Sequence, residues 1–268
     1  MTFRAMHRPF NPFVLANAWD AGSAKMLQAL GAQAIATSSA AQAFTLGRPD
    51  GGTISRDEAL AHAQDLIAAV GIPVSGDFEN GFGDAPDTCA ETVRLSAEIG
   101  LAGICIEDIA FPAGTPYDPK LAAERIKAAA AAARAAPQDF FLVARADGIM
   151  TGHYDITEAI ARIQAFEAAG ADGVYVPLPK TMDDLTRICA SVSIPVNALA
   201  AGPFARYTLS DFAKAGVARV SLGSALARVT HHAIHDAAAA IFGDGTFIPL
   251  SHGMAGDAVD ALLTAQKR

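Results

Sequence analysis

The sequence has few cysteines and no long apolar run, and each shortage excludes a class of protein. Its three cysteines, Cys89, Cys105 and Cys189, are odd in number and scattered, which gives neither a disulfide framework nor zinc-ligand spacing. No apolar run approaches the roughly 18 residues that cross a bilayer, and no signal-peptide core follows the charged N-terminus. We therefore expect a soluble, cytoplasmic protein.

Basic charge is scarce as well. Lysine and arginine number 20 against 28 aspartates and glutamates, for a net charge of −8, so the chain lacks the basic surface of a nucleic-acid-binding protein. Charged residues make up 18% of the 268 and hydrophobic residues 51%, which predicts a well-buried core. Neither nucleic acid nor membrane is expected as a partner. A small anionic molecule fits if a metal and local arginines reverse the field in its site.

Short apolar strand-like runs alternate with alanine-rich helical patterns along the chain. Eight strands are predicted, at residues 13–16, 34–38, 73–77, 103–107, 140–146, 173–177, 195–199 and 219–222. Helical patterns lie between them, at residues 21–30, 56–70, 87–99, 119–136, 156–169, 182–190 and 210–215. Eight such units predict an α/β fold, a (β/α)8 TIM-type barrel. The alternative is a doubly wound open sheet, which the even strand spacing disfavours.

The predicted barrel is a single domain over residues 1–268. Residues 224–268 exceed what closure of the eighth unit requires, and we expect them to form a C-terminal helical extension in two segments, 224–242 and 256–267. Such an extension either caps the barrel or packs on a neighbouring subunit.

Three acidic side chains follow two neighbouring predicted strands: Asp77 and Glu79 after one, and Glu107 after the next. Strand C-termini of a barrel meet on one face and adjacent strands lie about 4.8 Å apart, so these carboxylates are expected within reach of one ion. Their mutual repulsion favours a hard cation, Mg²⁺ or Mn²⁺, as the cofactor. The alternative for Asp77 and Glu79 is a polar strand end capped by solvent.

Arg145 belongs to the following strand and offers a planar fork to a carboxylate or a developing oxyanion. The alternative is an internal salt bridge to Asp147 or Glu107. Asp50 lies in a glycine-containing stretch long enough to bring it to the barrel mouth, although a surface loop is the simpler interpretation.

Uncharged polar groups end two further strands. Ser38, Ser39 and Ala40 offer backbone N–H groups as an anion nest, although serine at a strand end is more often part of a turn. Asn197 is predicted either to line the pocket or to cap the chain with its amide. Among the histidines, the pair at i, i+4 formed by His231 and His235 has a metal-ligand spacing, but a helix surface or subunit contact is favoured there.

A series of segments in this order resembles the isocitrate lyase/phosphoenolpyruvate mutase superfamily, over roughly residues 11–225. The segments are 17–24 (NAWDAGSA), 37–40 (TSSA), 46–50 (LGRPD), 77–84 (DFENGFGD), 106–112 (IEDIAFP) and 144–147 (ARAD). The resemblance implies a barrel that is often a homotetramer, with a C-terminal helix exchanged between subunits. A homo-oligomer, dimer or tetramer, is therefore expected.

The resemblance also implies roles for individual residues. It places Mg²⁺ near Asp77, Glu79 and Glu107, with Asp77 as the most direct ligand. It places the substrate carboxylate at Arg145 and at the backbone of residues 38–40, and it sets Asp50 near the reacting centre.

Two departures from the superfamily pattern bear on the reaction. The lyases carry a Lys-Lys-Cys-Gly-His loop whose cysteine is the catalytic acid, whereas residues 111–118 here read FPAGTPYD. The same loop lacks the Lys-Thr-Asn-Ser type of sequence expected in a phosphonate mutase. Glu79 also stands where an aspartate is usual, which lengthens that arm of the site by one methylene.

The function predicted from these features is a Mg²⁺-dependent carbon–carbon lyase or decarboxylase acting on a small 2-oxo or 2-hydroxy carboxylate or dicarboxylate. Asp50, Arg145 and Glu107 are its predicted catalytic residues, and Ser38, Ser39, Ala40, Arg145 and Asn197 its predicted substrate-binding residues. The nearest rival function is that of a carbon–phosphorus bond enzyme of the phosphonopyruvate hydrolase or phosphoenolpyruvate mutase type. A barrel that binds phosphate after its last two strands is a third possibility, and a non-catalytic binder of 2-oxo acids is a fourth.

Overall fold

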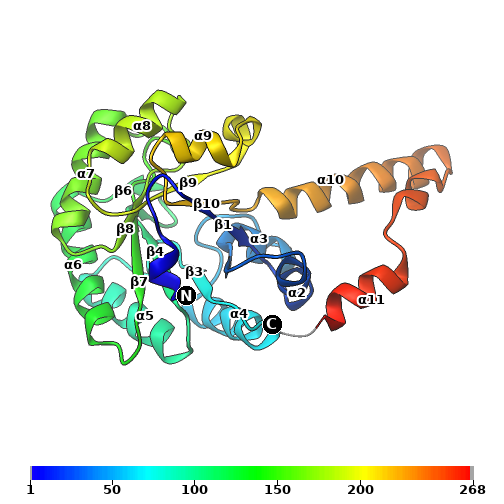
Figure 1. The fold of residues 1–268 in the computed structure, drawn as a ribbon, viewed down its shortest axis with the longest axis horizontal. Helices are drawn as coiled ribbons and strands as arrows, with labels where there is room; N and C mark the ends of the chain where they lie inside the picture. The colour runs from blue at the N-terminus through cyan, green and yellow to red at the C-terminus, as the bar shows by residue number, and fades with distance from the viewer. Residues whose placement is uncertain (1, 266–268) are drawn as a thin grey trace.

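The computed structural model describes residues 2–265, in which eight parallel strands close into a barrel (Figure 1). The order around the barrel is β1-β10-β9-β8-β7-β4-β3-β2. The barrel strands are β1 (Phe13–Asn17), β2 (Ile35–Ala36), β3 (Val74–Asp77), β4 (Gly103–Glu107), β7 (Phe141–Arg145), β8 (Gly173–Tyr175), β9 (Val196–Leu199) and β10 (Arg219–Ser221). The predicted (β/α)8 fold is thus confirmed, and each predicted strand overlaps an observed one.

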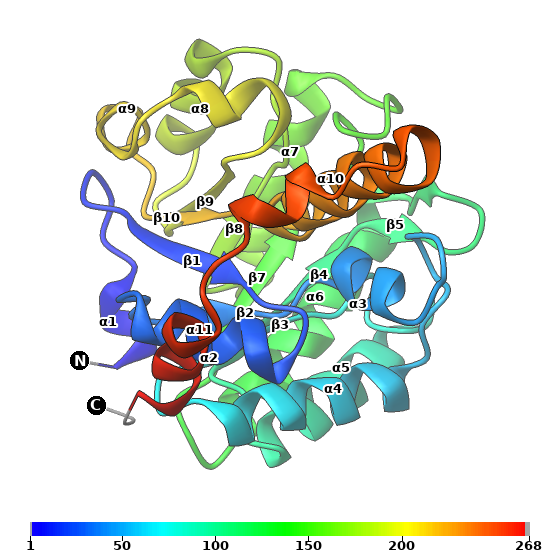
Figure 2. The ribbon, with the colours of Figure 1, turned by 90° about the vertical axis from the view of Figure 1, so that its right-hand side faces the viewer.

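The seven predicted helices are also present, and they form the outer ring around the strands (Figure 2). They are α2 (Ala21–Ala29), α4 (Arg56–Ala69), α5 (Pro86–Glu98), α6 (Pro119–Ala135), α7 (Ile156–Ala168), α8 (Met182–Ala190) and α9 (Leu209–Lys214). Side-chain caps fix where several begin: Asp20, Ser55 and Thr208 each form a reciprocal capping box. The alanine-rich stretch of α6 buries Ala129, Ala130 and Ala133, which lets this helix pack closely against its neighbours.

Several short elements were not expected from the sequence. They are the helices α1 (Phe3–Met6) and α3 (Ser39–Thr45), the two-stranded hairpin of β5 (Ile109–Ala110) and β6 (Thr115–Pro116), and the 3-10 turn η1 (Gly202–Arg206). The prediction extended the second strand to residue 38, but Ser38 instead caps α3 by accepting a hydrogen bond from the Ala41 N–H. The hairpin occupies the loop after β4, where the superfamily lyases carry their catalytic cysteine.

The N-terminal end of the barrel is closed by an aromatic plug. Phe3 of α1 meets Phe13 and Phe141 edge-on, and the His7 ring stacks on Phe141 with the centroids 3.8 Å apart. Asp172 ties α1 to the barrel wall by ion pairs with Arg4 and Arg134 at 2.6 and 2.7 Å. With this end sealed, the open C-terminal end is left for a ligand.

The C-terminal arm, residues 225–265, leaves the barrel and then turns back toward it (Figure 1). It consists of α10 (Ala225–Ala239), the π-helical turn η2 (Ala240–Asp244), the 3-10 turn η3 (Ile248–His252) and α11 (Gly256–Thr264), which contacts α2. Residues 266 and 267 of the predicted second helical segment lie outside the described part. No helix of the described chain is long and apolar enough to cross a membrane.

Candidate active site

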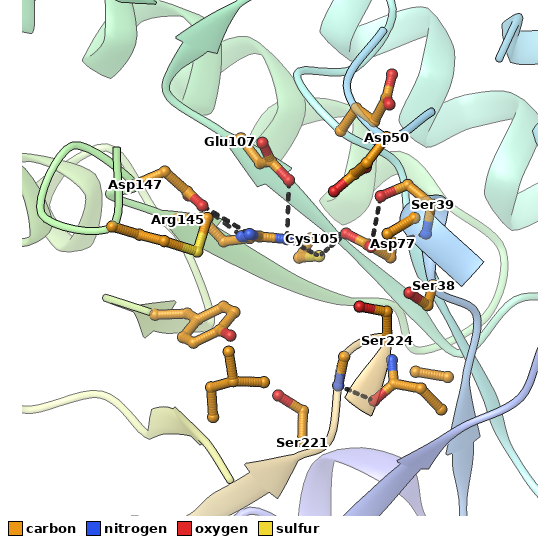
Figure 3. Close-up of a pocket in the computed structure, with 18 of the residues that line it drawn as sticks. Ser38, Ser39, Asp50, Asp77, Cys105, Glu107, Arg145, Asp147, Ser221 and Ser224 are labelled. Carbon is orange, nitrogen blue, oxygen red and sulfur yellow. Dashed lines mark hydrogen bonds and ion pairs between the residues drawn. The ribbon is translucent and has the colours of Figure 1, made fainter. Parts of the chain in front are cut away.

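A cavity of about 300 Å³ opens at the C-terminal end of the barrel, on the side opposite the aromatic plug (Figure 3). Its wall combines strand ends with the loops that follow them, as in other barrels of this type. The polar lining residues are Asn17, Ser38, Ser39, Asp50, Ser75, Asp77, Glu79, Cys105, Glu107, Arg145, Asp147, Thr151, Tyr175, Asn197, Arg219, Ser221 and Ser224. All the predicted site residues therefore line one cavity, Ala40 included.

Arg145, the last residue of β7, is the centre of the ion pairs in this cavity. Its Nη1 lies 2.9 Å from Oδ1 of Asp77 and 2.9 Å from Oε1 of Glu107. Its other side is held by the fully buried Asp147, with Nη2 2.6 Å and Nε 3.2 Å from the two carboxylate oxygens. The salt bridges foreseen as the alternative for Arg145 are thus present, and they fix the guanidinium at the cavity wall.

Asp77 is held from three directions at the end of β3. Its Oδ2 accepts hydrogen bonds of 2.9 Å from both the backbone N–H and the hydroxyl of Ser39. The thiol of Cys105 lies 3.3 Å from the other carboxylate oxygen, Oδ1. Arg145 contacts that same oxygen, so the carboxyl group of Asp77 has a fixed position at the cavity wall.

Glu79 reaches the same cavity by a different route from the one expected. Strand β3 ends at Asp77, and Glu79 has a left-handed backbone with φ 44°, so strand alternation does not place it. A glutamate in this conformation is uncommon, and such outliers gather at functional sites. Its Oε1 accepts a 2.9 Å hydrogen bond from the Gly52 N–H. Burial raises the pKa of Glu79 to about 7, and the charges of Asp77 and Asp50 add to the effect.

Glu107 and Asp50 add further negative charge around this point. Burial first, and then the carboxylates of Asp147, Asp77 and Glu79, raise the pKa of Glu107 well above its ordinary value, against the opposing charge of Arg145. Asp50 sits at the cavity mouth, where partial burial of its carboxyl and the charge of Asp77 raise its pKa. Several carboxylates thus compete for one guanidinium, an excess of negative charge that a divalent cation would relieve.

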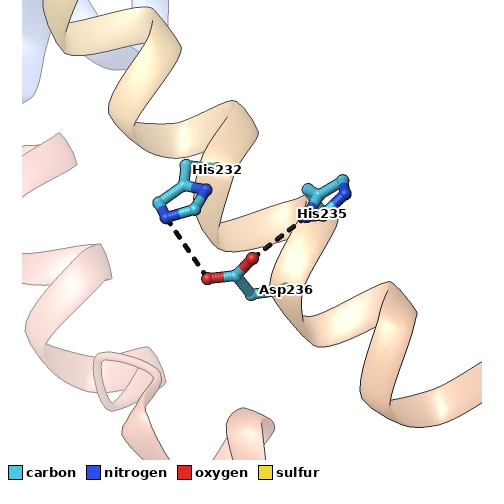
Figure 4. A group of neighbouring side chains, drawn as sticks. All are labelled: His232, His235 and Asp236. Carbon is cyan, nitrogen blue, oxygen red and sulfur yellow. Dashed lines mark hydrogen bonds and ion pairs between the residues drawn. The ribbon is translucent and has the colours of Figure 1, made fainter.

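The carboxylates of Asp77, Glu79 and Glu107 do not form a compact cluster. Within residues 2–265, one group of three ligand atoms lies within 4.8 Å, and it is His232, His235 and Asp236 on the exposed surface of α10 (Figure 4). At the barrel mouth a cation would therefore touch some carboxylates directly and others through water, as Mg²⁺ commonly does. The histidine cluster contains His235 of the pair noted in the sequence, but its other members are His232 and Asp236 instead of His231.

Several polar groups of the predicted substrate-binding residues already form hydrogen bonds within the protein. The Ser39 N–H and hydroxyl are both committed to Asp77, and the Ser38 hydroxyl caps α3. Both ends of the Asn197 amide are engaged: Oδ1 accepts from Nε of Arg219 at 2.8 Å, and Nδ2 donates to the Ser221 hydroxyl at 2.9 Å. Asn197 therefore lines the cavity, the first of the two roles considered for it, and its amide binds two side chains instead of capping the chain.

A second buried polar layer stands behind the cavity wall. Asp108 accepts a hydrogen bond from the Asp147 backbone N–H at 2.8 Å and another from the Tyr154 hydroxyl at 2.8 Å. Arg162 of α7 pairs with the same Asp108 carboxylate at 3.1 Å. These contacts fix the backbone that carries Asp147, and through it the guanidinium of Arg145.

Among the cavity residues that were not predicted, Cys105 and Arg219 contact predicted site residues. Cys105 was noted only as one of three scattered cysteines, but its thiol faces Asp77 inside the cavity. Arg219 was not predicted as a site residue because it is the first residue of its strand, whereas ligand-binding groups of a barrel are expected at strand C-termini. The signal was present: an arginine heads the apolar run of the last strand.

Residues 3–242 match the model of a protein family described as phosphoenolpyruvate phosphomutase. An uncharacterized protein of Mycobacterium tuberculosis (strain ATCC 25618 / H37Rv) is 38% identical over 94% of this chain and 92% of its own length. The 2,3-dimethylmalate lyase of Eubacterium barkeri is 33% identical over 65% of this chain and 62% of its own.

Two solved structures extend these comparisons. A lyase/mutase candidate from Burkholderia cenocepacia J2315 superposes with a TM-score of 0.94 and 43% identity, covering 99% of this chain and 95% of that one. A phosphonopyruvate hydrolase in complex with oxalate and Mg²⁺ superposes with a TM-score of 0.84 and 25% identity, covering 98% and 95% of the two chains. The family match spans most of the sequence and agrees with the resemblance drawn from its motifs, so this chain belongs to the phosphoenolpyruvate mutase/isocitrate lyase superfamily.

Proposed function

We propose that the protein is a Mg²⁺-dependent lyase or decarboxylase acting on a small 2-oxo or 2-hydroxy carboxylate. It cleaves the bond between C3 and C4 of a 2-oxo acid, or the bond between C2 and C3 of a 2-hydroxy acid. The observation that carries this proposal is the position of Arg145, held between Asp77, Glu107 and Asp147 at the wall of one cavity. A fixed guanidinium of this kind suits an oxyanion that develops during the reaction.

The chain's own residues supply binding and charge. In a decarboxylation, the electron pair of the broken bond moves onto the carbonyl oxygen as carbon dioxide leaves, and the product is an enolate. In a retro-aldol cleavage, the hydroxyl loses its proton as the bond breaks, and an aldehyde or ketone leaves together with an enolate. In both cases Arg145 donates hydrogen bonds to the developing negative charge, and Asp147 keeps the guanidinium in place.

The residues present fit a divalent cation. The donor set is made of oxygens alone. Burial, and after it the neighbouring carboxylates, raise the pKa values of Glu79 and Glu107, and a cation bound beside them would favour their charged forms. Asp77 would be the direct ligand, with Glu79 and Glu107 bound directly or through water. Mg²⁺ bound there, or Mn²⁺ in its place, supplies a Lewis acid that polarises the carbonyl or hydroxyl oxygen of the substrate.

A proton must also be moved, and the hairpin β5–β6 offers neither cysteine nor histidine for that step. Asp50 is the residue we assign to it. Its carboxyl lies at the cavity mouth, and burial and then the charge of Asp77 raise its pKa, so that it holds a proton more readily than a free aspartic acid does. A ligand in the cavity would lie between Asp50 and the Arg145 cluster, so a proton can reach the carbon left by the broken bond.

The substrate class is tested by an assay panel with Mg²⁺ and, in parallel, with a chelator. The panel contains oxaloacetate, 2-methylisocitrate, 2,3-dimethylmalate and phosphonopyruvate. Metal-dependent cleavage of one or more of the first three supports the proposal. Cleavage of phosphonopyruvate alone would assign the site to carbon–phosphorus chemistry, and tight binding of 2-oxo acids with no cleavage would make the protein a binder.

We further propose a homo-oligomer that covers the C-terminal arm. The arm exposes seven large apolar side chains, Val229, Ile234, Phe242, Phe247, Ile248, Leu250 and Met254, and Phe242 is 87% exposed. Monomers seldom leave such a series open to water. Sedimentation of the full chain, compared with a Phe242→Asp variant, tests this point: the variant should dissociate, and a monomeric wild type would rule the oligomer out.

A further inference from the structure

Arg219 is a buried cation without a carboxylate partner. The residue is 4% exposed and lines the same cavity as Arg145. Within residues 2–265 no Asp or Glu oxygen lies within 4.0 Å of its guanidinium, whereas Arg145 has three such partners. Its side chain thus brings a positive charge into the barrel that no protein side chain neutralises in contact.

The register of the sheet places Arg219 and Arg145 on one row. Arg145 of β7 pairs with Tyr175 of β8, Tyr175 pairs with Asn197 of β9, and Asn197 pairs with Arg219 of β10. Partners in register share a face of the sheet, so all four side chains enter the barrel, and each lines the cavity. One small molecule in the cavity can therefore meet Arg145 at one end of the row and Arg219 at the other.

The neighbours of Arg219 orient it without neutralising it. Asn197 accepts a 2.8 Å hydrogen bond from Nε, and its own amide is fixed by Ser221. The second neighbour, Nε2 of His7, lies 3.4 Å from Nη1. Burial, and then the charge of Arg219, lower the pKa of His7 to about 3, so this ring is neutral at pH 7 and acts as an acceptor.

The hydroxyl of Tyr175, on the same row, is uncharged as well, because burial raises its pKa far above neutrality. Burial lowers the pKa of Arg219 to about 10, so the guanidinium itself stays protonated at pH 7. A desolvated cation in this situation is costly unless an anion joins it.

We propose that Arg219 binds a second negatively charged group of the substrate, and that Asn197 positions it for that role. This inference rests on the proposed function and narrows it, because it selects diacids over monoacids. Arg145 and the carboxylates around it take the reacting end of the molecule, while the far carboxylate extends to Arg219 and the hydroxyl of Ser221. A free inorganic anion would be bound by the same groups, so the experiment must distinguish it from the second carboxylate of a substrate.

The test compares two ligands that differ by a single carboxylate. Malate and lactate are titrated calorimetrically into the full-length protein with Mg²⁺, for the wild type and for Arg219→Gln, Arg219→Lys and Asn197→Ala. The wild type is expected to prefer malate by at least tenfold. Arg219→Gln should lower this preference at least tenfold, and Arg219→Lys and Asn197→Ala by smaller factors, since the charge remains but its orientation is lost.

The ratio of the two affinities separates a binding role from a structural one. A general disturbance of the barrel would weaken both ligands in parallel and leave the ratio unchanged, and that result would overturn the proposal. The same holds if the wild type shows no preference for malate. If Arg219→Gln does not fold, an unchanged ratio in Arg219→Lys and Asn197→Ala would overturn the proposal in the same way.

Two further measurements, a titration with phosphate and the substrate panel itself, distinguish the remaining explanations for Arg219. If phosphate binds to the wild type but not to Arg219→Gln, and the wild type does not prefer malate over lactate, the occupant is an inorganic anion. That result would overturn the assignment of Arg219 to substrate binding. Failure of every substrate in the panel, with an Arg219-dependent preference for malate, would refute the proposed reaction and leave the anion site standing. Turnover of a diacid, together with a malate-to-lactate affinity ratio that Arg219→Gln leaves unchanged, would support the proposed reaction and refute the anion site.

Discussion

Replacing Asp147 by asparagine tests whether the buried carboxylate behind Arg145 holds the site together. Asp147 is fully buried and forms two hydrogen bonds to the guanidinium, at 2.6 and 3.2 Å. Breaking a buried ion pair from one side costs about 3–5 kcal/mol. Arg145 keeps Asp77 and Glu107 as partners in the variant. We therefore expect a loss of about 3 kcal/mol in the free energy of unfolding, measured by urea denaturation.

The same variant should lose activity as well as stability. Both oxygens of Asp147 accept hydrogen bonds from Arg145, so in either orientation the amide introduced at position 147 would turn its NH₂ group toward Nη2 or Nε. Arg145 would then shift from its fixed position. A displacement of about 1 Å at a reacting group costs on the order of 100-fold in rate. We expect kcat/KM on the active substrate of the panel to fall by about that factor.

Asp172→Asn provides the matched control, because it makes the same chemical change in an ion pair outside the cavity. Its partners Arg4 and Arg134 are 38% and 52% exposed, so solvent screens the pair and the loss of stability should be about 1 kcal/mol. Its kcat/KM should stay within about twofold of the wild type, a margin of roughly 0.4 kcal/mol. If Asp172→Asn loses as much stability and as much activity as Asp147→Asn, the claim that Asp147 acts specifically through Arg145 is refuted.

Two other predictions follow from the packing around the site. Gly52→Ala would set a methyl group 2.7 Å from Cβ of Phe111, at a residue whose φ is +71°. The loop that carries Asp50 must then move, so we expect a loss of about 1–3 kcal/mol in the free energy of unfolding and a fall in kcat. Wild-type values of both quantities would contradict this prediction. Burial lowers the pKa of His7 from 6.5 to about 3. Between these two pH values the unfolded chain binds a proton at His7 and the folded chain does not, so the free energy of unfolding falls as the pH falls. His7→Phe should remove up to about 3 kcal/mol of the difference in unfolding free energy between pH 7 and pH 4, and an unchanged pH dependence would show that His7 is protonated in the folded protein.

The sequence predicted the features that follow from local pattern. Apolar runs alternating with helical patterns located all eight strands, and the acidic residues that end β3 and β4 located the cavity, because parallel strands in a barrel end on one face. Asp77, Glu107 and Arg145 therefore came together as expected. The roles assigned to these residues stay predictions.

The features that were missed depend on contacts between distant parts of the chain. Glu79 reaches the cavity through a left-handed backbone, and the Gly52 N–H holds its carboxylate; strand alternation predicts neither feature. The polar environment of Cys105 depends on Asp77, a residue of another strand. Arg219 is recognisable as an unneutralised charge only when every neighbour of its guanidinium is known. Pairing across strands, and not local propensity, decides these positions.

The most direct test of the central claim is the steady-state turnover of Glu107→Gln with Mg²⁺ on the substrate that the panel identifies. Glutamine keeps the size of the side chain and removes the charge that faces Arg145 at 2.9 Å. If the cluster of Asp77, Glu107 and Arg145 is the reaction centre, kcat should fall at least 100-fold, a change of about 2.7 kcal/mol in the barrier, while the variant stays folded. Turnover at the wild-type rate in a folded Glu107→Gln protein would contradict the account and move the chemistry elsewhere.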